Sequence, residues 1–174
     1  RLVTDRSIFG HCIHLSDSEC RRLVEAGSVV AHCPTSNLFL GSGLFDMQQA
    51  NRVGMQTVLA TDIGAGTSFS MLRTMGEQLG GYPMSVFESL YKCTLGAAKA
   101  LHLDDEIGCF GKGRKADFIV MDYAATPSQQ VRMDYLKRHG KWTLENKLFG
   151  LQTAGDERNI QATYVMGKRV FTLA

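Results

Sequence analysis

The stretch Ser28-Val29-Val30-Ala31-His32-Cys33 decides the fold of this chain. It is a continuously apolar run, which is typical of a strand buried on both faces of a sheet. A helix is predicted directly before it, because Ser16 and Glu19 form a capping-box pattern and Gly27 is a typical helix stop. Strands of this kind that alternate with helices favour a parallel sheet with helical crossovers. We therefore predict an α/β fold.

The same alternation continues on both sides of this strand. Turn residues, β-branched runs and apolar periodicity delimit the further elements. In chain order we predict a strand over 7–13, a loop from Pro34 to the turn at 41–43, a short helix over 46–52, a buried strand over 57–61, a helix over 68–79 and a helix over about 85–101 that begins with a second capping box, Ser85 to Glu88.

The pattern changes in the last third of the chain. Strands are predicted over 116–122, 162–166 and 168–172, and the last two are joined by a hairpin at Met166-Gly167. The polar stretch over about 127–159 has little periodicity and is predicted as helix and loop. The C-terminal part is therefore expected to be a small β element.

Composition excludes several classes of protein. The chain has 174 residues, 44% of them hydrophobic, which excludes a disordered chain. Lys and Arg number 19 against 17 Asp and Glu, with no run of five like charges, so we expect no nucleic-acid partner. The apolar runs are too short to span a membrane. The five cysteines are an odd count without a C-x-x-C pair, which favours reduced thiols and a cytoplasmic location.

Three side chains with useful chemistry lie at or near predicted strand ends: His11, His32 and Asp62. In parallel α/β sheets the loops at these ends form the crevice that holds ligands. Asp62 precedes a glycine-rich loop, where it can ligate a divalent metal or accept a proton; the alternative is a cap on the following turn. His11 can hold a metal, a water or a substrate heteroatom, or it is a core histidine, and His32 has the same ambiguity.

The remaining histidines, His14, His102 and His139, are expected in a loop or on the surface. Because adjacent parallel strands bring their carboxyl ends to one rim, we expect His11 and Asp62 to point into one cavity. One aspartate and two histidines do not establish a metal site, since a catalytic zinc usually takes three or more protein ligands.

Several stretches resemble the amidohydrolase superfamily, in the branch of purine and triazine deaminases and chlorohydrolases. The last three strand ends of its barrel look like residues 11–15, 32–38 and 60–67, and its passage into a small β-sandwich looks like residues 95–120. Within that branch, the stretches most similar to the guanine deaminase family are 40–45, 64–72 and 155–160.

The resemblance implies the C-terminal part of a (β/α)8 barrel of the TIM type. Residues 1–106 would hold the last three strands and the following helices, and residues 107–174 would return to the small β-sandwich domain. The family's other metal ligands would lie upstream of Arg1. We therefore expect a piece of a longer enzyme that is inactive alone.

The resemblance also implies hydrolytic deamination of guanine to xanthine and ammonia with one zinc ion. Asp62 matches the strand-8 aspartate that ligates the metal and moves the proton of the attacking water. His11 matches the strand-6 histidine beside that water and the purine. His32 matches a position that either supports the site residues from behind or is structural. Both Asp62 and His11 are thus predicted to be catalytic and substrate-binding residues.

Two alternatives stay open at this point. The chain could belong to another amidohydrolase, such as an S-adenosylhomocysteine or adenosine deaminase, a triazine hydrolase or imidazolonepropionase. It could instead be a non-catalytic α/β module in which Asp62 and His11 are only structural. For the intact enzyme we expect a purine substrate, no membrane partner and a homo-oligomeric state, namely a dimer.

Overall fold

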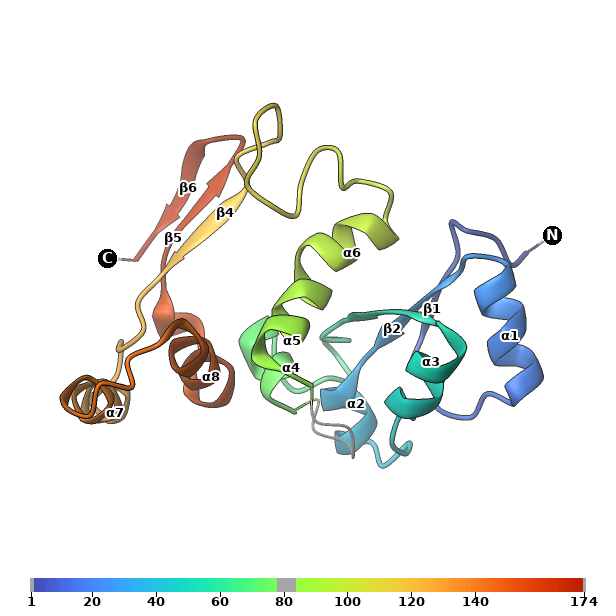
Figure 1. Ribbon diagram of the computed structural model, residues 1–174, viewed down its shortest axis with the longest axis horizontal. Helices are drawn as coiled ribbons and strands as arrows, with labels where there is room; N and C mark the ends of the chain where they lie inside the picture. Colours follow the sequence, from blue (N-terminus) through green and yellow to red (C-terminus); the bar gives the residue numbers. More distant parts are fainter. Residues whose placement is uncertain (1, 78–83, 174) are drawn as a thin grey trace.

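The computed structural model describes residues 2–77 and 84–173, and its first part is built on a parallel sheet (Figure 1). The strands are β1 (Ile8–Gly10), β2 (Val29–His32) and β3 (Gln56–Leu59), in the order β1-β2-β3. Gly10 pairs with Ala31, and Ala31 pairs with Val58. The predicted parallel arrangement is therefore confirmed.

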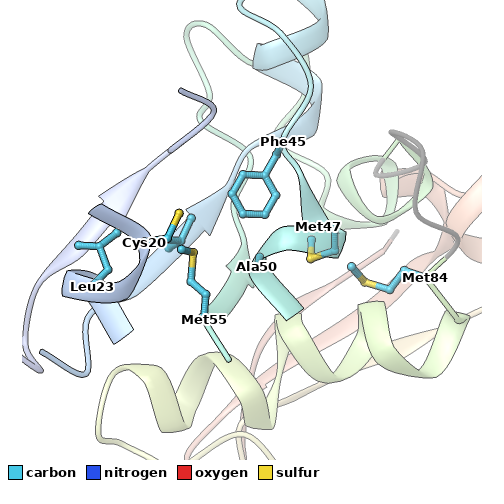
Figure 2. Close-up of a cluster of buried hydrophobic side chains, with 8 residues drawn as sticks. Cys20, Leu23, Phe45, Met47, Ala50, Met55 and Met84 are labelled. Atoms are coloured by element: carbon cyan, nitrogen blue, oxygen red, sulfur yellow. The ribbon is translucent and has the colours of Figure 1, made fainter. Parts of the chain in front are cut away.

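Two helices cover one face of this sheet. They are α1 (Asp17–Glu25), which begins with the predicted capping box of Ser16 and Glu19, and α3 (Met47–Val53), which begins at the Asp46 cap. Their apolar side chains pack with Val30 of β2 into one buried cluster. Figure 2 shows this cluster, whose labelled members are Cys20, Leu23, Phe45, Met47, Ala50, Met55 and Met84.

The loop predicted from Pro34 is wrong in its first half. Residues Pro34–Phe39 form the short helix α2. Proline is favoured in the first turn of a helix, because its fixed φ suits the helix and its missing N–H is not needed there. Pro34 therefore marks the start of a helix and does not interrupt one.

The helix predicted over 85–101 is two helices. α5 (Val86–Cys93) and α6 (Leu95–Ala100) are separated at Thr94, which has φ −127° and ψ −106°. The Thr94 hydroxyl donates to the carbonyl of Leu90 at 2.7 Å, a local bond that competes with regular helix geometry. The second capping box is only half formed, since the Ser85 side chain accepts from the backbone N–H of Glu88 without the reciprocal bond.

The helix predicted over 68–79 begins later than expected. It is α4 (Met71–Glu77), because the Ser68 hydroxyl accepts from the N–H of Ser70 in a turn before the helix. Residues 78 and 79 of that prediction lie outside the described residues.

The C-terminal part contains a second, antiparallel sheet. It consists of β4 (Phe118–Met121), β5 (Ile160–Val165) and β6 (Lys168–Thr172) in the order β4-β5-β6, so the predicted hairpin is confirmed. The stretch between β4 and β5 folds into α7 (Pro127–Arg138), α8 (Leu144–Ala154) and the 3-10 turn η1 (Glu157–Asn159).

A buried amide ties η1 to this second part. Asn159 is fully buried, donates to the Asp122 carbonyl at 2.7 Å and exchanges bonds with Gln129. Its oxygen also accepts from the N–H of Asp156 at 3.0 Å. Within the stretch 155–160, Asn159 is thus a buried polar residue whose hydrogen bonds are satisfied, while Glu157 and Arg158 are exposed.

Helix α8 joins the two parts of the chain, and Figure 1 shows it beside α4 and α5. Gln152 of α8 accepts from the hydroxyl of Ser89 at 3.0 Å and donates to the carbonyl of Val86 at 2.9 Å. Gly76 of α4 lies so close to α8 that an added Cβ would meet the Gln152 carbonyl oxygen at 2.2 Å. None of the helices in 2–77 and 84–173 is long and apolar enough to cross a membrane.

His32 is a core residue at the end of β2. It is 6% exposed and stacks on Phe45 with ring centroids 5.0 Å apart. Burial, helped by the charge of Lys92, lowers the pKa of His32 to about 4, so the ring is neutral near neutral pH. This placement agrees with the structural position that the resemblance implied.

We predict that Gly76→Ala destabilises the fold. In a helix this change normally stabilises by about 1 kcal/mol, but here the methyl group meets the α8 backbone. The overpacking should lower the free energy of unfolding of the full-length protein by about 1–3 kcal/mol, measured by urea titration. Gly111→Ala is the control, because the nearest atoms there belong to the flexible Arg114 side chain. Equal stability of the two variants would contradict the close approach of α4 and α8.

A second prediction concerns acid stability. Unfolded His32, with its ordinary pKa of 6.5, takes up a proton that the folded protein accepts only near pH 4. Stability should therefore fall as the pH is lowered from about 6.5 to about 4. The pKa difference of 2.5 (6.5 minus 4) corresponds to about 3 kcal/mol. His32→Leu should flatten this part of the urea-midpoint profile, whereas His139→Gln, at an exposed position, should leave it unchanged.

Candidate functional site

The carboxyl ends of the parallel strands bring three reactive side chains together. His11 follows β1 and extends the ladder through its N–H to the Ala31 carbonyl at 3.0 Å. Cys33 directly follows β2, and Asp62 lies three residues beyond the end of β3. One ligand atom from each of these side chains lies within 4.8 Å of the others.

His11 and Asp62 face each other, as expected from the parallel strands. The His11 Nε2 atom lies 3.7 Å from the Asp62 Oδ2 atom, and both side chains are partly open to solvent. On its other side, His11 Nδ1 lies 2.9 Å from Oδ1 of Asn37. The imidazole is therefore held between an amide in α2 and the carboxylate after β3.

The backbone at these positions is in the left-handed region. His11 has φ 65°, Cys12 has φ 51° and Asp62 has φ 49°. This region is uncommon for residues other than glycine, and such strain gathers at functional sites, where the surrounding fold maintains it. The strands that precede these residues are fixed in the sheet. The backbone strain is therefore confined to the turns after the strands, and these turns determine the direction of the side chains.

The turn after Asp62 is closed by the backbone. The Asp62 carbonyl accepts from the N–H groups of Ala65 and Gly66, and a Cβ at Gly66 would collide with the Thr61 carbonyl oxygen at 1.9 Å. Among the residues described, the Asp62 carboxylate makes no hydrogen bond to this turn. The alternative that Asp62 caps the turn with its side chain is therefore not observed, and the carboxylate points toward His11.

Cys33 is the buried member of the group. It is 3% exposed and its thiol donates to the Ala31 carbonyl at 3.3 Å. Burial, with the negative charge of Asp62, raises the pKa of the Cys33 thiol, although the backbone N–H of His11 works in the opposite direction. Burial therefore favours the protonated form of this thiol.

The exposed donors at this edge suit a divalent metal. A carboxylate oxygen and an imidazole nitrogen are both ligands that zinc accepts. The carboxylate of Asp62 has no hydrogen bond with which a metal would have to compete in the described part of the chain. The residues present therefore fit a metal ion, with Asp62 as the carboxylate ligand.

The other histidines lie away from this edge or have structural contacts. Nε2 of His14 contacts the Ser42 carbonyl at 3.1 Å, and Nε2 of His102 contacts the Asp5 carbonyl at 2.9 Å. His139 packs against Tyr135 with ring centroids 4.4 Å apart. All three are exposed, as expected for His102 and His139 from their polar surroundings.

Two neighbours of the site were not among the predicted site residues. Asn37 contacts His11 directly, and Cys33 lies within the group of ligand atoms. Both fall in the stretch 32–38 that carries the resemblance, so that stretch held the signal. Asn37 was predicted to lie in a loop, whereas it lies in α2, from which its side chain reaches His11.

A cavity of about 810 Å³ lies elsewhere, between α4, α5, α8 and the second sheet. Its walls include Met71, Leu90, Met121 and Leu151. Neither His11 nor Asp62 lines it, so this cavity does not belong to the site at the strand ends.

Comparison with known proteins places this geometry in a family. The amidohydrolase family model matches residues 2–170. Guanine deaminase of Escherichia coli (strain K12) is 48% identical over 98% of this chain, which spans 39% of that relative's length. The solved structure of E. coli guanine deaminase superposes with a TM-score of 0.92 at 46% identity, covering 99% of this chain and 40% of the other.

Two more distant structures share the fold and contain ligands. A guanine deaminase from C. acetobutylicum with guanine in its active site has a TM-score of 0.76 at 25% identity, covering 94% of this chain and 39% of that one. An adenosine deaminase from Xanthomonas campestris with bound zinc has a TM-score of 0.74 at 25% identity, covering 98% and 38%. The predicted fold, part of a (β/α)8 barrel with strands of a small β domain, is thereby confirmed, and the chain belongs to the amidohydrolase family.

Proposed function

We propose that this chain forms part of an enzyme that hydrolyses guanine to xanthine and ammonia. The observation that carries the proposal is the Asp62 carboxylate facing the His11 imidazole at 3.7 Å, at the carboxyl edge of a parallel sheet. The 48% identity to a guanine deaminase supports guanine as the substrate. The adenosine deaminase structure, at 25% identity, gives less support to an adenosine substrate.

In this proposal Asp62 is a metal ligand and the main proton carrier. Zinc, when bound, would supply a water of lowered pKa near 7. Asp62 accepts a proton from the attacking water and delivers it to the departing amine, because a solvent-accessible carboxylate at this edge can exchange protons with both groups. His11 accepts a hydrogen bond through Nε2 and so orients the water beside the purine.

Three further features of the intact enzyme are proposals. We infer a boundary near residue 106 between the barrel part and the small β domain, since the two sheets lie on either side of it. A homodimer and a cytoplasmic location are likewise inferred. Analytical ultracentrifugation and cell fractionation of the full-length protein test the last two.

We expect Asp62→Asn in the full-length enzyme to lower the rate of xanthine formation by more than about a hundredfold, because the amide cannot accept the proton. Asp134→Asn, which removes an exposed carboxylate on α7, is the matched control and should keep normal turnover. Turnover within a few fold of normal in Asp62→Asn would reduce Asp62 to a structural residue.

The companion variant His11→Ala separates the two roles. We expect it to lose turnover and keep its zinc, measured by elemental analysis, since His11 is assigned to water and substrate. Loss of zinc would instead make His11 a ligand. A full-length protein that holds no metal and deaminates no purine would favour the non-catalytic module.

The 174-residue chain alone exposes surfaces that a closed barrel covers. Both outer strands of the parallel sheet, β1 and β3, have an unpaired edge among the described residues. Ile8 of β1 is 47% exposed. Barrel closure pairs such edges, and open edges promote association.

We therefore predict that these 174 residues, expressed alone, form no soluble monomer, hold less than one zinc per chain and produce no xanthine. Mass measurement in solution, elemental analysis and a product assay check the three points against the full-length protein as control. A monomer with one zinc per chain and turnover would show that all ligands lie within these residues.

A further inference from the structure

Asn37 is a buried amide committed to His11. It lies in α2 and is 2% exposed. Its Oδ1 atom contacts His11 Nδ1 at 2.9 Å, while its Nδ2 atom has no hydrogen-bond partner among the residues described. A buried amide is costly to fold unless its bonds are used, so a leucine would suit a purely structural position better. Within residues 2–77 and 84–173, the contact with His11 is the one side-chain hydrogen bond that Asn37 makes.

The contact fixes the position of a proton. An amide oxygen accepts hydrogen bonds and cannot donate, so a bond of 2.9 Å to Oδ1 requires the hydrogen on His11 Nδ1. In a neutral imidazole the other nitrogen, Nε2, then carries a lone pair.

The far side of the ring agrees with this assignment. An Nε2–H group would be drawn to the Asp62 carboxylate at about 2.7–2.9 Å, the usual length of a bond to an ionised acceptor. The observed separation is 3.7 Å, too long for a direct hydrogen bond. Two hydrogen-bond acceptors at this distance, Nε2 of His11 and Oδ2 of Asp62, can both bond to one donor group placed next to them.

We propose that Asn37 is a positioning residue that holds His11 as the Nδ1–H tautomer, so that Nε2 acts as an acceptor beside Asp62. The consequence for catalysis rests on the proposed function. The water or amino group that approaches Asp62 then meets a second acceptor, Nε2 of His11. Asn37 touches His11 and acts through it.

Helix α2 gives Asn37 a fixed position relative to all three strand ends. The N–H of Asn37 donates to the Cys33 carbonyl at 3.0 Å, and its own carbonyl accepts from Ser42 at 3.0 Å. The Thr35 hydroxyl donates to the Thr61 carbonyl at 3.3 Å, one residue before Asp62. These bonds fix the position of the Asn37 amide relative to the carboxyl edge of the sheet.

The test compares the unmodified full-length protein with two variants of it, Asn37→Leu and Asn37→Asp. The first variant removes the acceptor at similar volume, whereas the second keeps an oxygen acceptor for Nδ1–H. Histidine labelled with nitrogen-15 reports the tautomer of neutral His11 directly, and His11→Gln identifies its resonances. We expect the Nδ1–H form in the unmodified protein and in Asn37→Asp, and loss of that preference in Asn37→Leu.

Turnover of guanine is the second readout. We expect Asn37→Leu to lower kcat by about tenfold or more, with a smaller change in KM, because outer contacts of this kind are worth about 10–100-fold. Asn37→Asp should lie closer to the unmodified protein than Asn37→Leu does. Equal kcat in the unmodified protein and a folded Asn37→Leu would overturn the proposal.

The tautomer readout separates this inference from the proposed function. An Nε2–H tautomer in the unmodified protein overturns the role of Asn37 even if guanine is deaminated, and this outcome does not require either Asn37 variant to fold. An Nδ1–H tautomer that depends on Asn37, in a protein that does not deaminate guanine, supports the positioning role and overturns the substrate assignment.

Discussion

The parallel pairing of β1, β2 and β3 is the constraint on which the site depends. Gly10, Ala31 and Val58 lie in register across the sheet, so the chain leaves all three strands at one edge. His11 and Asp62 are 51 positions apart in the sequence (62 minus 11), yet their side chains approach to 3.7 Å. A one-residue slip in either pairing would turn alternate side chains to the opposite face and separate them. The burial of Val29 and Val30 on both faces of β2 stabilises this register.

The rigid sheet also maintains the strained backbone at the site. Left-handed conformations at residues other than glycine cost about 1–3 kcal/mol each, and they persist where the surroundings determine them. His11 is fixed by its bond to the Ala31 carbonyl, and the turn after Asp62 is closed by its own carbonyl and by the absence of a Cβ at Gly66. The backbone thus supplies all the hydrogen bonds of the turn. The carboxylate is left available because it has no part in holding the loop.

Much of this arrangement could be predicted from the sequence, because its signals are local. Apolar strands between turn residues, the Ser16 capping box and the Met166-Gly167 hairpin are all encoded within a few residues. The break at Thr94 was missed because a threonine within a helical pattern gives no clear local signal, and its hydroxyl bond to Leu90 depends on the final geometry. Helix α2 was missed because proline at its start has the same appearance as proline in a loop. Asn37 was missed with it, since its contact with His11 spans 26 positions.

The acceptor atoms of Asp62 and His11 at the carboxyl edge of the sheet determine what these two residues can bind. Asp62 offers lone pairs, and His11 offers a lone pair at Nε2 when Asn37 holds the hydrogen on Nδ1. Acceptors repel one another at 3.7 Å unless something electron-poor lies beside them. In the proposed site, a metal ion or a donor such as water or an exocyclic amine would supply that charge beside both acceptors. The strained loops and the buried amide of α2 hold the acceptors in place before such a ligand arrives, which is what preorganised catalysis requires.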